Sequence, residues 1–353
     1  RGGMKVLCYS SFTFSYLDRA RVLFHSLRKH HPDWELVALM TDAPPPGLAF
    51  DPADEPFDRV VWAQDLNLQD FDAFLFQHDI VEMCTAVKGP FLHRACTDAA
   101  FAGGAQAIIY MDPDTAVFAP LDPVLERLEE ADIVLTPHLA GPETDAAGIR
   151  DNELSALRTG VYNLGFVAIR TTGEGARFAA WWAQRLRWAC YDDIPAGLFT
   201  DQRWCDQVPT LFDRVHILRD PGFNIASWNV GQRRVTIGHD GVIRVKGAVL
   251  RFWHFTKLGP VGDAMTRRHA KGNAQVYEIW NWYKRRIEDC AVISLPERWW
   301  AYGSYADGTP IPRSDRIAYR QADLRARFTE PFASGPNSFQ AYRQALAQTD
   351  AAG

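Results

Sequence analysis

The sequence lacks the features that mark several specialised classes of protein. It contains no apolar run of about 18 residues and no signal-peptide pattern, so we expect neither a membrane span nor export. The formal net charge is only -5, which gives no reason to expect nucleic acid or an anionic membrane as a general partner, although peripheral membrane association stays open. The six cysteines form no CxxC pair, so we expect no structural zinc and instead reduced thiols in a cytoplasmic protein.

The composition is that of an ordinary globular protein. Hydrophobic residues make up 47% of the 353 positions and charged residues 23%, which suits one large domain or two small ones. The twelve tryptophans are unusual, and most of them lie in the second half of the chain. We expect most of them to anchor the core, while the remainder could line a groove for a sugar or a hydrophobic acceptor.

The chain is organised around a short apolar run that ends in two aspartates. Ala107 to Met111 is rich in β-branched and aromatic residues and predicts a buried strand. Asp112 and Asp114 follow it, and side chains two positions apart in extended backbone point to the same side. Pro113 stops further strand pairing, so both carboxylates should project from the strand end. A hard divalent cation would relieve their repulsion, although the same residues also suit a plain turn.

The first forty residues have the pattern of a strand, a helix and a second strand. Met4 to Ser11 and Glu35 to Met40 are strand candidates, and Tyr16 to His30 between them has apolar residues at helical spacing. Such units build parallel sheets that bind ligands at the carboxyl ends of their strands. We therefore predict an α/β fold with a mainly parallel central sheet flanked by helices.

The later chain continues this alternation with less regular segments. Leu139 to Ser155 is polar and predicts a mobile loop beside the site, where we expect acceptor choice to reside. Tyr162 to Ile169 predicts a strand, and Gly197 to Trp204 predicts a helix with Thr200 as its N-cap. Ala264 to Asp289 predicts a further helix.

Five motifs follow one another in a fixed order: the strand–helix–strand start, the aspartate pair, and the runs N-L-G at 163–165, D-Q at 201–202 and H-F-T-K-L-G at 254–259. This order resembles the retaining glycosyltransferases of the GT-A fold, most closely the family-8 type that includes bacterial lipopolysaccharide galactosyltransferases and glycogenin. The resemblance covers about residues 4–262. It implies a GT-A (Rossmann-like) domain at 4–265, with a nucleotide-binding half at 4–118 and a donor-sugar and acceptor half at 119–265. A helical C-terminal extension follows at 266–353.

The resemblance also implies a metal centre. Asp112 and Asp114 match the two carboxylates that hold manganese on the nucleotide diphosphate, and His254 matches a third ligand. Two carboxylates and an imidazole suit Mn²⁺ or Mg²⁺ better than zinc. Lys257 and Gly259 match residues that contact the diphosphate, although the family often has H-x-x-G-x-x-K-P-W, with its lysine after the glycine.

The remaining donor-site residues are implied by the same resemblance. Asn163 and Gly165 match an N-x-G that lies against the donor sugar, where glycine permits close approach. Positions matching the uridine and ribose site, together with a basic residue near the donor, are Tyr9, Ser10, Thr13, Asp42 and Lys88.

Asp201 and Gln202 match the D-Q pair beside the anomeric carbon and are the predicted catalytic residues. The same pair also suits the first turn of a helix, where an acidic side chain is favourable. The segment from Asn224 to Arg233 has no counterpart in the family, and its Asn229 and Arg233 could face the acceptor.

The predicted function is metal-dependent transfer of a hexose from a nucleotide sugar, with a UDP-sugar expected, to a hydroxyl of a glycan or other acceptor. Retention and a role in bacterial glycan or lipopolysaccharide synthesis follow from the resemblance only. A nucleotidyltransferase or metal-dependent phosphohydrolase would also use paired aspartates, usually with a further carboxylate. A non-catalytic nucleotide- or carbohydrate-binding domain is the third reading. The sequence identifies neither donor sugar, acceptor, linkage nor oligomeric state.

Overall fold

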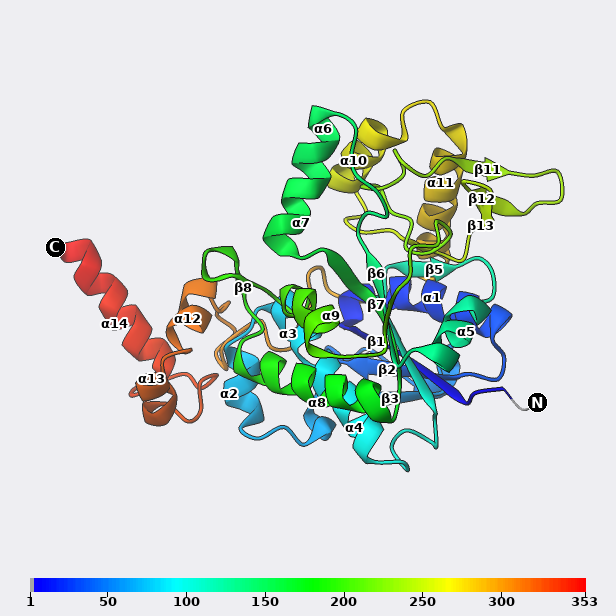
Figure 1. The fold of residues 1–353 in the computed structure, drawn as a ribbon. Coiled ribbons are helices and arrows are strands. Elements are labelled where there is room, and N and C mark those ends of the chain that lie inside the picture. The colour runs from blue at the N-terminus through cyan, green and yellow to red at the C-terminus, as the bar shows by residue number, and fades with distance from the viewer. Residues whose placement is uncertain (1–2) are drawn as a thin grey trace.

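A seven-stranded mixed sheet forms the centre of the protein (Figure 1). The structure is a computed structural model that describes residues 3–353. In sheet order the strands are β10 (Val215–Ile217), β6 (Ile133–Pro137), β7 (Tyr162–Arg170), β4 (Ala107–Met111), β1 (Val6–Phe12), β2 (Glu35–Met40) and β3 (Arg59–Trp62). All neighbouring pairs are parallel except those of β7, which runs antiparallel to both β4 and β6. The predicted mainly parallel sheet is therefore confirmed.

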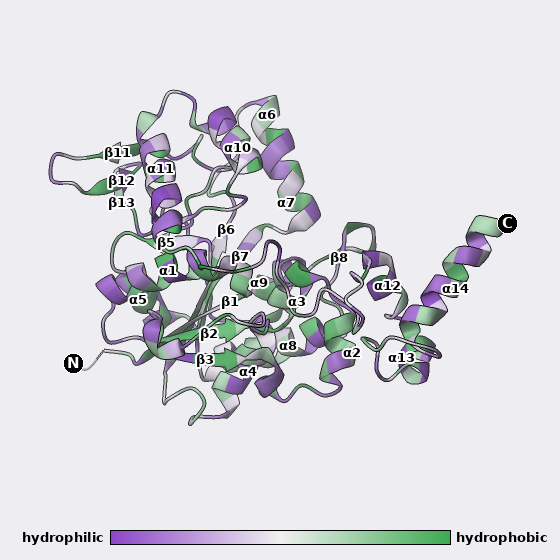
Figure 2. Ribbon diagram, turned by 180° about the vertical axis from the view of Figure 1, so that it is seen from behind, coloured by the Kyte–Doolittle hydropathy of each residue, from purple (hydrophilic) through white to green (hydrophobic). Residues whose placement is uncertain are grey.

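Helices cover both faces of this sheet, because successive strand residues point to opposite sides. Leu7 and Tyr9 of β1 belong to a core with α4 (Lys88–Thr97) and α8 (Gly173–Trp188). The intervening Cys8 belongs to a second core on the other face. That face is covered by α1 (Leu17–His30) and α5 (Asp122–Glu130). Figure 2 shows the hydrophobic central strands lying between helices of mixed colour.

A smaller lobe with sheets of its own lies beyond the ends of β4 and β6 (Figure 1). Its core contains Trp253, Phe255 and Tyr283, and the rings of the last two stack with centroids 3.8 Å apart. Its elements are β5 (Thr115–Val117) paired with β14 (Phe252–His254), the sheet of β11 (Val235–Ile237), β12 (Ile243–Val245) and β13 (Ala248–Val249), and the helices α10 (Pro260–Ala270) and α11 (Ala274–Asp289).

Two local predictions in this region are wrong. The segment predicted as a mobile loop is largely helical, as α6 (Ala146–Gly148), a π-helical turn (Ile149–Glu153) and α7 (Leu154–Thr159). The segment predicted as a helix from Gly197 to Trp204 is instead the short strand Leu198–Phe199 and a turn. Thr200 is therefore not a helix N-cap: its φ of 46° is left-handed and its hydroxyl donates to the carboxylate of Asp201. Intervening elements are β8 (Asp192–Asp193), β9 (Leu198–Phe199), α9 (Val208–Leu211) and 3-10 turns at Phe14–Tyr16, Pro52–Asp54, Ala63–Leu66, Ile194–Ala196 and Arg203–Gln207.

The C-terminal residues are helical, as predicted, but they lie in two places. Residues 266–289 belong to α10 and α11 in the smaller lobe, and the predicted boundary after residue 265 falls inside α10. Helices α12 (Arg313–Ala318), α13 (Ala322–Arg327) and α14 (Phe339–Ala352) instead lie beside α2 (Phe71–Phe76) and α3 (Ile80–Ala86), with Phe76 in their shared core (Figure 1). Within residues 3–353 no helix is long and apolar enough to cross a membrane.

Candidate active site

The aspartate pair lies where β4 leaves the central sheet. The Asp112 N–H donates to the Gly165 carbonyl at 2.8 Å, so Asp112 is still held against β7. The chain then turns at Pro113, and the Thr115 hydroxyl donates back to the Asp112 carbonyl at 2.7 Å. Thr115 begins β5, whose pairing with β14 places His254 directly opposite it. The β5–β14 pair therefore brings His254, which comes late in the chain, next to the two aspartates.

Asp112, Asp114 and His254 form a compact group of potential metal ligands. One ligand atom from each residue lies within 4.8 Å of the others. The Nε2 atom of His254 is 2.9 Å from Asp114 Oδ1 and 3.6 Å from Asp112 Oδ2. Burial alone would lower the pKa of His254, but the adjacent Asp114 carboxylate outweighs this and raises it. The donor set of two carboxylates and one imidazole fits Mn²⁺ or Mg²⁺.

Lys88 joins this group to Asp201. Its ammonium lies 3.1 Å from Asp112 Oδ1 and 2.9 Å from Asp201 Oδ2. Burial would lower the pKa of Lys88, but the two carboxylates raise it, so the side chain stays an ammonium ion. Tyr110 also donates to Asp112 Oδ1, at 2.7 Å. One oxygen of Asp112 is thus held by protein donors, and the other faces His254.

Asn163 and Gly165 lie on β7 next to the three potential ligands. Asn163 Oδ1 accepts from the Gly165 N–H at 2.8 Å, and Asn163 Nδ2 is 3.3 Å from His254 Nδ1. A Cβ atom on Gly165 would lie 2.7 Å from His254 Cε1 and 2.8 Å from Asp112 Oδ2. The absence of a side chain at 165 is therefore required by the way these residues pack.

Asp201 and Gln202 reach the same place from the segment that follows β9. Asp201 is 3% exposed, and burial raises the pKa of its carboxyl although Lys88 counteracts the effect. Gln202 Nε2 donates to the Thr159 carbonyl at 2.9 Å, and Gln202 Oε1 accepts from the Leu164 N–H at 3.4 Å. Gln202 therefore connects α7 to β7.

These residues line one cavity of about 650 Å³ next to the end of β4. Nine predicted site residues contribute to its wall: Lys88, Asp112, Asp114, Asn163, Gly165, Asp201, Gln202, His254 and Lys257. Arg150 also lines the cavity, and it belongs to the segment 139–155 that was predicted to lie beside the site. Lining residues that the sequence did not indicate are Tyr16, His138, Arg158, Trp228, Arg268 and His269. Most of these lie on helices or turns at the rim and have no motif of their own, so only the tertiary structure could reveal them.

The four positions predicted to bind uridine and ribose do not line this cavity. Tyr9, Ser10, Thr13 and Asp42 are all buried. The Tyr9 hydroxyl donates to the Lys88 carbonyl at 2.8 Å, which supports the turn that carries Lys88. The carboxylate of Asp42 accepts the N–H groups of Phe14, Ala43 and Ala301. Burial raises the pKa of Asp42 to about 6, and these N–H groups counteract the shift.

Four further predicted positions have distinct environments. Lys257 is an exposed residue at the cavity rim, and Gly259, outside the cavity lining, has a φ of 123° just before Pro260 opens α10. Asn229 is buried and bonds to the carbonyls of His138 and Asn224. Arg233 is also buried and donates to the Phe223 carbonyl at 2.7 Å. Neither Asn229 nor Arg233, which could have faced the acceptor, is among the residues that line the active-site cavity.

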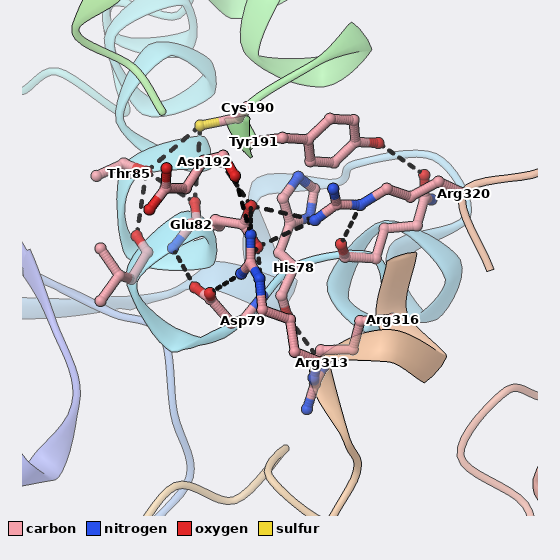
Figure 3. A network of polar contacts seen from close by, with 12 residues as sticks. His78, Asp79, Glu82, Thr85, Cys190, Tyr191, Asp192, Arg313, Arg316 and Arg320 are labelled. Carbon is pink, nitrogen blue, oxygen red and sulfur yellow. Dashed lines mark hydrogen bonds and ion pairs between the residues drawn. The ribbon is translucent and has the colours of Figure 1, made fainter. Parts of the chain in front are cut away.

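A buried ion-pair network connects the C-terminal helices to the segment that carries Asp201. Figure 3 shows Glu82 of α3 between Arg313 and Arg320. Glu82 is fully buried, and its carboxylate lies 3.2 Å from Arg313 and 3.1 Å from Arg320. Glu82 Oε2 also accepts the N–H of Asp192 at 2.7 Å. Because β8 and β9 lead from Asp192 to Asp201, residues from α12 and beyond help to fix the active-site wall.

Comparison with known sequences finds two relatives in Bacillus subtilis (strain 168). The uncharacterized protein YfnF is 26% identical over 152 residues, which cover 43% of this chain and 49% of that protein. The uncharacterized protein YfnD is 25% identical over 257 residues, which cover 70% of this chain and 78% of that protein. The chain thus spans about half the length of YfnF. No family model matches the sequence.

Several solved structures have a related fold. The galactosyltransferase LgtC, in complex with donor and acceptor sugar analogs, is 14% identical, with 83% of this chain and 98% of that chain covered and a TM-score of 0.43. Mouse xyloside xylosyltransferase 1 is also 14% identical, with 73% and 99% covered and a TM-score of 0.41. The bifunctional glycosyltransferase WbbM is 12% identical, with 79% and 51% covered and a TM-score of 0.42. At these values the likeness describes the fold alone.

Proposed function

We propose that this chain is a metal-dependent glycosyltransferase that moves a hexose from a nucleotide sugar, with a UDP-sugar expected, to an acceptor hydroxyl. The observation that carries the proposal is the convergence of Asp112, Asp114 and His254 in a cavity that also contains the Lys88–Asp201 pair. Retention, a glycan acceptor and a place in bacterial glycan or lipopolysaccharide synthesis are taken from the sequence resemblance and complete the proposal.

Asp112, Asp114 and His254 would hold the cation in this proposal. A bound Mn²⁺ or Mg²⁺ supplies Lewis-acid stabilisation of the negative charge on the diphosphate leaving group. Lys257 at the rim adds a positive charge that can approach a phosphate oxygen. Arg150, Arg158 and Arg268 also line the cavity, so anionic groups of a substrate would enter a favourable field.

The residues beneath the cation site would position the donor sugar. Gly165 has no side chain of its own, which lets His254, Asn163 and Asp112 pack against the strand beside the proposed sugar site. Asn163 and Gln202 present amide groups that can bond sugar hydroxyls. Asp201 would face the reacting carbon, with its charge and orientation controlled by Lys88. The acceptor hydroxyl would gain its advantage from being held close to that carbon.

The structure favours this reaction over nucleotidyl transfer or phosphate hydrolysis with two metal ions. The cavity contains two further carboxylates, and both are already paired: Asp201 with the buried ammonium of Lys88, and Asp151 with Arg268 at 2.7 Å. Among residues 3–353, the group around Asp112 is the one set of three potential metal ligands that lie together. A second cation would have to compete with Lys88 or Arg268 for its ligand.

The test is a calorimetric titration of UDP into the protein, first with Mn²⁺ and then with a chelator. We expect binding that requires Mn²⁺ and is lost or weakened at least about tenfold in His254→Ala, because removal of a ligand impairs the cation site. His239→Ala is the matched control, since His239 lies exposed in the turn between β11 and β12. Turnover of UDP-sugars would then be measured with the parent protein.

Two results would contradict the proposal. Equal UDP affinity in Mn²⁺ and in chelator would remove the metal from nucleotide binding. Unchanged affinity in His254→Ala would show that this histidine is no part of the site. If UDP does not bind under either condition, the same titration with GDP decides between another nucleotide and a domain that binds none.

A further inference from the structure

A second and larger cavity lies on the other side of residues 197–203 from the active site. Its volume is about 1330 Å³, and its walls come from α2, the end of α8 and α13 (Figure 1). Leu198 and Arg203 line this cavity, while Phe199 and Gln202 between them line the active-site cavity. The two cavities therefore share one short segment as their common wall.

The most conspicuous residue at this cavity is Trp188, the last residue of α8. It is 73% exposed, although a large apolar ring normally gains free energy from burial. Trp204 lies beside it with ring centroids 6.2 Å apart, and the Trp204 Nε1–H donates to the Ala189 carbonyl at 2.8 Å. A fixed ring thus supports the exposed one. Flat aromatic surfaces of this kind can pack against the C–H face of a pyranose ring.

Polar side chains with planar groups surround these rings. Arg187 donates from Nη2 to the Gln69 carbonyl at 2.9 Å and lies 4.6 Å above the Phe74 ring. Its Nη1 atom is buried and has no hydrogen-bond partner among residues 3–353. Asp70, Asp72, Gln77 and Gln207 contribute carboxylate and amide groups to the same walls. Hydroxyl-rich ligands use such a mixture of planar donors and acceptors.

The charges that line this cavity are paired or balanced, which favours an uncharged ligand over a polyanion. Arg203 is paired with Asp206 at 3.3 Å, and Arg320 is paired with Glu82 at 3.1 Å. Arg187 and Arg325 have no carboxylate within ion-pair distance in residues 3–353, but Asp70 and Asp72 line the same cavity and balance them. The net field is therefore small, which does not favour nucleic acid or an acidic polymer.

We infer that this cavity is a binding groove for a neutral oligosaccharide, with Trp188 as its stacking platform. Its volume exceeds the roughly 300–1,000 Å³ of ordinary small-molecule sites, so it can hold several sugar rings. Binding of a saccharide in this cavity does not depend on the proposed reaction. That the cavity holds the distal part of a glycan acceptor does rest on the proposed function, and the segment 197–203, which borders both cavities, places it next to the active site.

The binding experiment uses the full chain without metal or nucleotide. Isothermal titration calorimetry, whose signal does not depend on the replaced tryptophan, measures binding of maltohexaose, a β-1,4-galactohexaose and an α-1,6-mannohexaose, with a galacturonic acid hexamer as the anionic arm. We expect at least one neutral hexamer to bind with a Kd below about 1 mM. Trp188→Ala should weaken that binding at least about tenfold, while Trp188→Phe, which keeps a flat ring, should retain most of it.

Two controls separate saccharide binding at this cavity from general surface effects and from the proposed function. Ile293→Ala removes another exposed apolar side chain, 85% exposed, and should leave binding unchanged. Asp112→Ala should also leave it unchanged, even where it abolishes UDP binding, so failure of the proposed function is distinguishable. The inference is overturned if no neutral hexamer binds, if Trp188→Ala binds as the parent does, or if only the anionic hexamer binds.

Discussion

The ammonium of Lys88 lies 2.9 Å from the Asp201 carboxylate, and the two side chains are 3% and 4% exposed. The same ammonium reaches Asp112 at 3.1 Å. One buried cation therefore connects the predicted metal-binding aspartate with the predicted catalytic aspartate. Such a pair is expensive to break, because the remaining charge has neither water nor a partner.

Replacement of Lys88 by methionine is expected to lower the free energy of unfolding by about 3–5 kcal/mol. Lys284→Met is the matched control, because Lys284 also pairs with an aspartate, Asp263 at 2.8 Å, but is 35% exposed. That variant should lose no more than about 1 kcal/mol. Urea unfolding of both variants measures the difference, and equal losses would show that Lys88 is not an important buried charge.

Replacement of Gly165 by alanine should disturb the cation site without a change of charge. The new Cβ would lie 2.7–2.8 Å from atoms of His254, Asn163 and Asp112, so these residues must move. If Asp112, Asp114 and His254 bind Mn²⁺, the affinity should fall by about 10–100-fold, as when supporting contacts of a metal site are lost.

The control for Gly165→Ala is Gly272→Ala, because a Cβ on Gly272 would meet no atom of the described residues within 4 Å. Mn²⁺ titration followed by electron paramagnetic resonance reports the affinity of both variants. Wild-type affinity in Gly165→Ala would argue against the site.

Glu82 is expected to couple the C-terminal helices to the active-site wall (Figure 3). Glu82→Gln keeps the shape but leaves Arg313 and Arg320 without their buried partner, and should cost about 3 kcal/mol of stability. Hydrogen exchange should also accelerate at the Asp192 amide, because its N–H donates to the Glu82 carboxylate in the parent protein.

The exposed residue Glu297 provides the control for this substitution, because Glu297→Gln changes the same charge on the surface. Hydrogen exchange measured by mass spectrometry would compare the peptide containing Asp192 in the two variants. An equal rate in both would contradict the coupling.

The stability of the protein should fall in mild acid because of His78. Its Nδ1 lies 2.6 Å from the Phe74 carbonyl, and burial lowers its pKa to about 3. The unfolded chain binds a proton below its ordinary pKa of about 6.5, whereas the folded protein stays neutral there. The unfolding free energy contributed by His78 is therefore about 2 kcal/mol lower at pH 5 than at pH 7.

Urea unfolding at the two pH values tests this prediction against His78→Asn, whose amide can still donate to the Phe74 carbonyl. His31 and His138, whose pKa values burial lowers to about 4, also contribute to the acid loss of the parent. The variant should therefore keep part of the pH dependence and lose the share of His78. The same dependence in both proteins would show that His78 does not titrate as expected.

Several elements of the fold and the candidate site could be predicted from sequence because their signals are local. The strands β1, β2, β4 and β7 were expected close to their observed positions, since each is a short apolar run between polar or glycine residues. The placement of Asp112 and Asp114 at a strand end follows from the same pattern. The segment 139–155 was wrongly predicted as a loop. Its helices, which continue to residue 159, leave Ile149, Leu154 and Leu157 exposed, so the sequence there has no clear apolar stripe that would indicate a buried helix face.

The sequence by itself determined where the strands β1, β2, β4 and β7 form, that an aspartate pair follows β4, and what chemistry these carboxylates can supply. Only the tertiary structure decided that Lys88 joins Asp112 to Asp201, that Glu82 is held by Arg313 and Arg320, and that Tyr9 and Asp42 are buried. Asp42 is covered because the Trp299–Ala301 segment returns and bonds to residues 41–43. The reason is physical: periodicity and turn chemistry act over a few residues, whereas burial and ion pairing depend on which distant segments the fold brings into contact.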